Sequence, residues 1–228
     1  FEDLKKLSHL DLVRNFLRYL QTNTFTGLES IIELDLSKMY ISEIKQGAFS
    51  GMHNLQTLDL HSSKIHEVNV GAFDGLSQLK SLNLNDNSFF IDAYTFRGLK
   101  KLEVLRLTKS DDYGEYLLDA ESFSGLESLT SLDISFFKIG YVDVGAFNGL
   151  DNVHTLNMSN NNIRQFIADT FIGMPDLKVL DLSNNSLHTF SAYSFYELDN
   201  VVSLNVSKNN ITSLKKNGFF WIKKAVHS

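Results

Sequence analysis

The sequence predicts a single solenoid of stacked strand-and-turn units, because one pattern of about 24 residues recurs along almost the whole chain. The unit reads L-x-x-L-x-L-x-x-N-x-L-x-x-L-x-x-x-x-F-x-G-L-x-x. Nine copies start at Leu7, Ile31, Leu55, Leu79, Leu102, Leu129, Val153, Leu177 and Val201. One position always holds phenylalanine: Phe1, Phe25, Phe49, Phe73, Phe96, Phe123, Phe147, Phe171, Phe195 and Phe219. Units of this length bury little alone, so we expect stacking to create one continuous core.

Residues 177–200 show how one unit is built. The segment 179–183 alternates apolar and polar residues, which predicts a short strand with Leu180 and Leu182 facing inward. Apolar residues then return at irregular spacing: Leu187, Phe190, Phe195 and Leu198. The segment 191–198 is too short for a full helix, so turns or brief 3₁₀ pieces are expected there. Successive strands should pair side by side in one parallel sheet.

Composition supports one domain over residues 1–228. Hydrophobic residues make up 43% of the chain, and no linker interrupts the period. There is no cysteine, which excludes disulfides, cysteine-ligated metal and cysteine-rich caps in this sequence. No apolar stretch is long enough to span a bilayer, so no direct membrane insertion is expected.

Charge and motif content argue against two classes of function. The net charge of −6 disfavours nucleic acid, whose phosphates are neutralised by clustered Lys and Arg. The seven histidines lack metal-ligand spacing, and no glycine-rich phosphate loop or nucleophile–histidine–acid arrangement is visible. We therefore expect no catalysis, no metal and no cofactor.

The strand-and-turn motifs carry a family resemblance. They read LDLSKMYI, LNLNDNSF, LNMSNNNI, LDLSNNSL and LNVSKNNI. The chain resembles the leucine-rich repeat proteins of the typical 24-residue class, common in animal extracellular proteins such as Toll-like receptors, relaxin-type receptors and secreted immune proteins. This resemblance implies an α/β solenoid shaped as a right-handed horseshoe, with a parallel sheet on the concave face and turns or short 3₁₀ pieces on the convex face. It also implies that proteins or other macromolecules bind the concave face.

The asparagine position of the unit is filled unevenly. Five residues fit it: Asn15, Asn87, Asn161, Asn185 and Asn209. Four do not: Met39, Ser63, Ser110 and Phe137. An unpaired buried backbone group costs roughly 1–3 kcal/mol, and only the serines can replace part of the amide's hydrogen bonding. The turns at Met39 and Phe137 are therefore expected to be rearranged or hydrated.

One outward-facing strand position is mostly acidic or amidic. It reads Asp11, Asp35, Asp59, Asn83, Arg106, Asp133, Asn157, Asp181 and Asn205. One interpretation is an acidic stripe of Asp11, Asp35, Asp59 and Asp133 that attracts a basic protein or peptide. The alternative is that aspartate is simply the usual residue in this repeat, with no function of its own.

The middle of the chain departs most from the pattern. The unit starting at Leu79 has 23 residues and the next has 27. Insertions in such units often lie at the binding face, and Arg, Tyr and exposed Phe are enriched at interface hot spots. We predict a partner site with these members: Arg106, Tyr113, Tyr116 and Phe136, with Asp111 and Asp112 at its rim. The alternative is a tolerated surface bulge. Tyr40, near Lys38 and Lys64, is a weaker candidate.

Four N-x-S/T sequons fit a secreted glycoprotein, although the repeat itself generates such triplets: Asn157, Asn184, Asn205 and Asn210. Three functions remain open. The first is the ligand-binding ectodomain, or part of it, of a receptor or secreted innate-immune protein. The second is an extracellular matrix or cell-adhesion protein, and the third is an intracellular scaffold. The expected partner is a protein or peptide, basic if the acidic stripe binds it, and the surface would also allow a homodimer.

Overall fold

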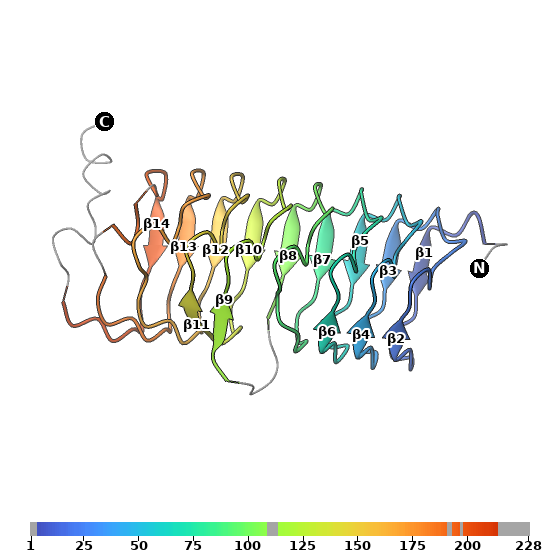
Figure 1. The fold of residues 1–228 in the computed structure, drawn as a ribbon, viewed down its shortest axis with the longest axis horizontal. Coiled ribbons are helices and arrows are strands. Elements are labelled where there is room, and N and C mark those ends of the chain that lie inside the picture. The colour runs from blue at the N-terminus through green and yellow to red at the C-terminus, as the bar shows by residue number, and fades with distance from the viewer. Residues whose placement is uncertain (1–3, 109–113, 191–192, 197, 214–228) are drawn as a thin grey trace.

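The computed structural model describes residues 4–108, 114–190, 193–196 and 198–213, which form a solenoid of stacked coils (Figure 1). Nine short strands pair in one parallel sheet, each next to the strand of the following coil. They are β1 (His9–Asp11), β3 (Glu33–Asp35), β5 (Thr57–Asp59), β7 (Ser81–Asn83), β8 (Val104–Arg106), β10 (Ser131–Asp133), β12 (Thr155–Asn157), β13 (Val179–Asp181) and β14 (Ser203–Asn205). The predicted parallel-sheet solenoid is confirmed.

A second row of strands runs below the main sheet in Figure 1 and is broken in the middle. One part contains β2 (Tyr19–Leu20), β4 (Glu43–Ile44) and β6 (Glu67–Val68). The other part pairs β9 (Tyr116–Leu118) with β11 (Ile139–Val142). The 23-residue unit that starts at Leu79 contributes no strand to this row, so the break coincides with the change in repeat length.

The core follows from the repeat. Equivalent leucines stand in register across the main sheet, and in the interior coils they are buried, as the alternation in residues 179–183 predicts. Eight phenylalanines form a continuous ladder in which the ring centroids of successive coils are 5.5–6.3 Å apart: Phe25, Phe49, Phe73, Phe96, Phe123, Phe147, Phe171 and Phe195. The rings are fully buried and nearly parallel, so each coil shares its core with its neighbours.

The return segments are made of turns. Leu28 N donates to Phe25 O and Ile31 N to Leu28 O, and equivalent bonds recur in later coils. The described ranges contain no helix, so the brief 3₁₀ pieces allowed by the sequence take the form of single turns. The glycine of the F-x-G-L motif adopts the left-handed backbone conformation, and at some coils close approach of the preceding coil also excludes a side chain, whereas at Gly51 and Gly149 a Cβ would meet nothing within 4 Å. At Gly173 (φ 94°), a Cβ would lie 2.7 Å from the carbonyl oxygen of Phe147.

In the coils that hold asparagine after the main strand, from Asn87 onward, its side chain connects successive coils. Asn185 Nδ2 donates to Met158 O and Leu182 O, and its Oδ1 accepts a bond from Ile163 N. Ser63 replaces this residue in its own coil, since its hydroxyl donates to Leu36 O and accepts from Met39 N. Each such side chain therefore satisfies backbone groups of the preceding coil as well as its own.

Of the two outcomes expected at Met39 and Phe137, a rearranged turn is not found, and hydration of these turns stays a prediction. Both side chains are buried, and the preceding residues Lys38 (φ 56°) and Phe136 (φ 58°) adopt the same left-handed conformation as Asn184 (φ 54°) in a regular turn. These turns survive because the next coil supplies the polar partner. Ser63 accepts from Met39 N, and Asn161 supplies an equivalent bridge to the coil of Phe137, where it bonds Ile134 O and Ile139 N. Ser110 lies outside the described residues.

Candidate functional site

The outward-facing position that is mostly acidic or amidic lies where each main strand ends in a turn, and its nine residues are called the acidic or amidic column. In eight of its nine members, the side-chain oxygen accepts a bond from the backbone N–H two residues later, at 2.8–3.2 Å. Such bonds explain why Asp and Asn are favoured where a strand gives way to a turn. This structural role accounts for the column without any ligand.

Arg106 is the exception in this column. It is exposed at the end of β8, between Asn83 of β7 and Asp133 of β10. A guanidinium has no acceptor, so it cannot form the strand-end turn. Instead, Asn85 of the preceding coil accepts the bond from Thr108 N at 3.0 Å. The neighbour thus takes over the structural bond, and the Arg106 side chain remains available at the surface.

Phe136 and Phe137 face opposite ways. Phe136 follows β10, the neighbour of β8, and its side chain is 57% exposed. Phe137 is buried and meets the ring of Tyr116 edge-on, with centroids 5.1 Å apart. Arg106 and Phe136 therefore lie on adjacent coils near the strand ends of the main sheet, whereas Phe137 belongs to the core.

Tyr116 does not line a surface site as predicted, because it is buried. Its hydroxyl donates to Ile91 O at 2.8 Å and accepts from Ile91 N at 2.9 Å. These are backbone groups of the short 23-residue unit, which has no strand in the second row. The tyrosine side chain thus supplies hydrogen bonds where strand pairing is missing, and burial raises its pKa. The remaining predicted members, Asp111, Asp112 and Tyr113, lie outside the described residues.

A charged bridge that the sequence did not predict lies beside the insertion. The two terminal guanidinium nitrogens of Arg164, Nη1 and Nη2, bond the Glu115 carboxylate, the former at 2.7 Å, and Arg164 also lies 5.9 Å from the centre of the Tyr141 ring. These hydrogen bonds hold the pKa of the Glu115 carboxyl below its usual range and raise the pKa of Arg164. Gly140 leaves room for the bridge, since a Cβ there would meet Glu115 Oε2 at 2.8 Å.

The four aspartates of the predicted acidic stripe all lie on the main sheet. Asp11, Asp35 and Asp59 occupy neighbouring strands in register, while Asp133 is separated from them by Asn83 and Arg106. Asp59 also bonds the ring of His61 at 2.8 Å and the amide of Asn83 at 3.2 Å. The stripe is therefore continuous only across the first three strands.

The sequon asparagines differ in their accessibility. Asn184, Asn205 and Asn210 are exposed, whereas Asn157 is half-buried in β12. The Asn205 amide donates to Asp181 Oδ2 at 3.1 Å, and that of Asn184 donates to Asn160 Oδ1 at 2.6 Å. Glycosylation at either residue would replace these contacts.

Two properties of the described part of the chain bear on chemistry and topology. It contains no group of three or more His, Cys, Asp or Glu side chains that could hold a metal ion. None of its segments forms a helix that is long and apolar enough to cross a membrane.

The 24-residue repeat, the unit positions that keep one residue type and the stacked parallel strands together define a leucine-rich repeat solenoid. The leucine rich repeat family model matches residues 32–89, 116–163, 127–187 and 152–211. The chain belongs to this family. A search of curated proteins finds no match.

Solved structures of receptors share the fold. The TLR13–ssRNA13 complex is similar with a TM-score of 0.75 and 28% identity, over 86% of this chain and 28% of that chain. The Toll–Spatzle complex of Drosophila gives 0.79 and 20%, over 94% and 28% of the two chains. The mouse RP105/MD-1 complex gives 0.74 and 23%, over 92% and 35%. The last two similarities show the fold alone.

The similarity is to Toll-like receptors in type, and it covers only part of each of them. The chain spans between 28% and 35% of the length of these three chains. One of these structures contains RNA, so the fold itself does not exclude nucleic acid, and the expectation of no nucleic-acid partner rests on net charge alone. The family and the neighbours support a ligand-binding module.

Proposed function

We propose that this chain is a non-enzymatic recognition module, part of the extracellular ligand-binding region of a receptor or of a secreted innate-immune protein. Its partner is a protein or peptide. The observation that carries the proposal is the pair Arg106 and Phe136. Both are exposed, both lie near the strand ends of adjacent coils, and both depart from the residue usual at their position. The neighbours TLR13, Toll and RP105 support a receptor role.

The chemistry of this pair suits a protein interface. An exposed phenylalanine supplies apolar area, and an arginine supplies planar, multidentate hydrogen bonding. Asp133 lies opposite Arg106 in the register, and the acidic strands β1, β3 and β5 lie on the same sheet. A ligand that spans the sheet would thus meet a cation and a ring in the middle and carboxylates at the N-terminal end, which favours basic groups on that part of the ligand. The exposed sequons Asn184 and Asn205 would place glycans on the C-terminal coils.

The test uses a partner captured from extracellular fluid of the source tissue and then purified. Arg106→Ala and Phe136→Ala are each expected to weaken its binding by about tenfold or more, as hot-spot truncations do. The matched control is Lys178→Ala with Tyr196→Ala, which removes an exposed cation and an exposed aromatic elsewhere and should leave binding unchanged. Equal binding by the site variants and the control would disprove this site.

A further inference from the structure

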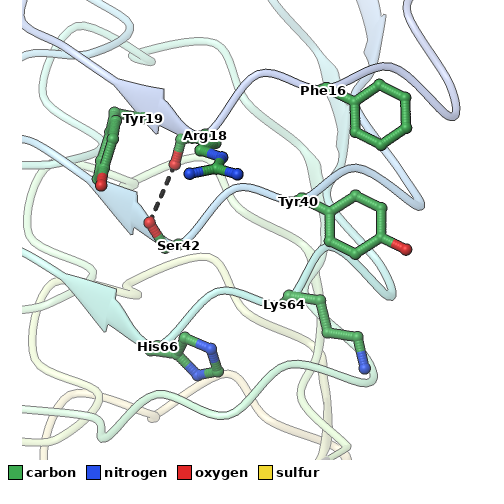
Figure 2. A pocket seen from close by; sticks show the side chains of 7 residues that line it. All are labelled: Phe16, Arg18, Tyr19, Tyr40, Ser42, Lys64 and His66. Carbon is green, nitrogen blue, oxygen red and sulfur yellow. Dashed lines mark hydrogen bonds between the residues drawn. The ribbon is translucent and has the colours of Figure 1, made fainter.

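A second exposed surface of the first three coils combines stacked aromatic rings with unpaired cations. Phe16 and Tyr40 occupy the same position of successive units, their ring centroids are 5.5 Å apart, and their planes differ by 9°. Phe16 is 81% exposed and Tyr40 is 55% exposed. Arg18, Lys64 and His66 stand beside them (Figure 2). We call these five residues the aromatic–basic patch.

The patch is hollowed. With Tyr19 and Ser42, its five residues line an open hollow of about 420 Å³. Two adjacent coils are tied together at the pocket, since Ser42 donates to Arg18 O through its backbone N–H at 2.8 Å and through its hydroxyl at 3.1 Å. Figure 2 shows the hydroxyl bond. The side chains that line the pocket therefore project from a fixed framework.

Charge at the patch is opposite to that of the protein as a whole. The segments 14–19, 38–42 and 62–66 contain the cations Arg14, Arg18, Lys38 and Lys64 together with His66 but no acidic residue, although the net charge is −6. The nearest acids along the chain are engaged elsewhere, as Glu43 pairs with Lys45 and Glu67 accepts from Asn69. Within the described ranges, no ion pair involves Arg18 or Lys64.

From this geometry we infer that the aromatic–basic patch binds an acidic peptide segment of a protein partner. Carboxylates of the segment meet Arg18 and Lys64, and an apolar side chain packs on the rings of Phe16 and Tyr40. A single-stranded nucleic acid would also stack on aromatic rings, but it needs a basic groove that follows its backbone. The equivalent position in later units holds Lys64, Ser88, Asp111, Lys138, Asn162, Ser186 and Asn210, none of them aromatic, so the stacked rings at this position do not continue beyond the second coil. The patch is separate from Arg106 and Phe136.

The test is a selection of random 12-residue peptides on the purified protein, with peptides that also bind Arg18→Glu/Lys64→Glu removed. Enriched peptides should contain two or more Asp or Glu next to an apolar residue. Their affinity should fall at least tenfold on Phe16→Ala and on Arg18→Ala/Lys64→Ala. It should be unchanged in Lys80→Ala/Lys178→Ala, which has the same net charge with the patch intact. Far-ultraviolet circular dichroism of each variant checks that it is folded.

Three results would overturn the inference. One is that no peptide is retained by the wild type beyond those that the doubly substituted protein also retains. Another is an enriched set that is neutral or basic. The third is that a 12-nucleotide oligouridylate binds the patch more tightly than the best peptide at 150 mM salt and loses that binding in Arg18→Ala/Lys64→Ala, which would assign the patch to nucleic acid.

Discussion

The coils that start at Val153 and Leu177 and the coils that start at Leu79 and Leu102 use the same fold in different ways. In the former, the strand-end position and the asparagine position of each unit are both filled by residues that bond the backbone of their own turn, as Asp181 and Asn185 do. In the latter, Asn83 and Asn87 still form their own turn bonds, but residues of neighbouring coils supply two others: Asn85 replaces the acceptor missing at Arg106, and Tyr116 bonds the backbone of Ile91. The difference teaches that a repeat can lose a consensus residue when a neighbour supplies its bond, and the released side chain can then face solvent.

The largest expected effect comes from Phe137→Asn, which restores the consensus residue in the unit that starts at Leu129, directly after the two irregular coils. This change removes a buried ring that packs on Tyr116 and should destabilise the protein by about 3 kcal/mol in urea unfolding, since the restored amide offsets little of the lost packing. The control, Phe136→Asn at an exposed site, should change stability by less than about 0.5 kcal/mol. Unchanged or increased stability of Phe137→Asn would mean that the two regions do not differ in this way.

A smaller effect is expected from Tyr116→Phe. The ring stays, but the N–H and C=O of Ile91 both lose their bonds to the buried hydroxyl, at a cost of about 2 kcal/mol. Tyr141→Phe removes an exposed hydroxyl in the same pair of strands and should be nearly neutral. Equal effects of the two substitutions in urea unfolding would remove the structural role assigned to Tyr116.

The smallest effect concerns the Glu115–Arg164 bridge and depends on pH. The folded protein lowers the pKa of Glu115 below its ordinary value of 4.5, so the stabilisation is present above that value and is lost as the pH falls through the lowered pKa. Arg164→Ala should therefore lower Tm at pH 7 by about 1 °C, a small shift because both side chains are partly exposed. The difference from wild type should shrink as the pH falls below 4.5. A difference that stays constant over that fall in pH would show that the bridge is not its cause.

Much of the fold could be predicted because the repeat specifies it locally. The alternation in residues 179–183 predicted β13 and its buried Leu180 and Leu182, and the phenylalanine column predicted the ladder. The structure of the insertion was harder to predict from the sequence, because the changed length of the unit hides which position each residue occupies. Tyr116 pairs with Ile139 in the second row and thus stands at a core position, which the sequence alone did not reveal.

Contacts between distant residues explain what the sequence missed at the candidate sites. Glu115 and Arg164 are 49 residues apart and come from coils of different length, so no pattern connects them. Phe16 and Tyr40, by contrast, are one full repeat apart, and alignment of the units would have placed them together. The prediction for Arg106 and Phe136 stays a prediction until a partner is measured.

The claim that neighbouring coils support the irregular ones is tested most directly by a double-mutant cycle on Asn85 and Arg106. Asn85→Ala alone should cost about 1 kcal/mol in urea unfolding, because Thr108 N loses its acceptor. In an Arg106→Asp background, the new carboxylate can accept that bond itself, so Asn85→Ala should cost less than half as much. If the two substitutions are additive to within about 0.3 kcal/mol, Asn85 does not compensate for Arg106, and the account is contradicted.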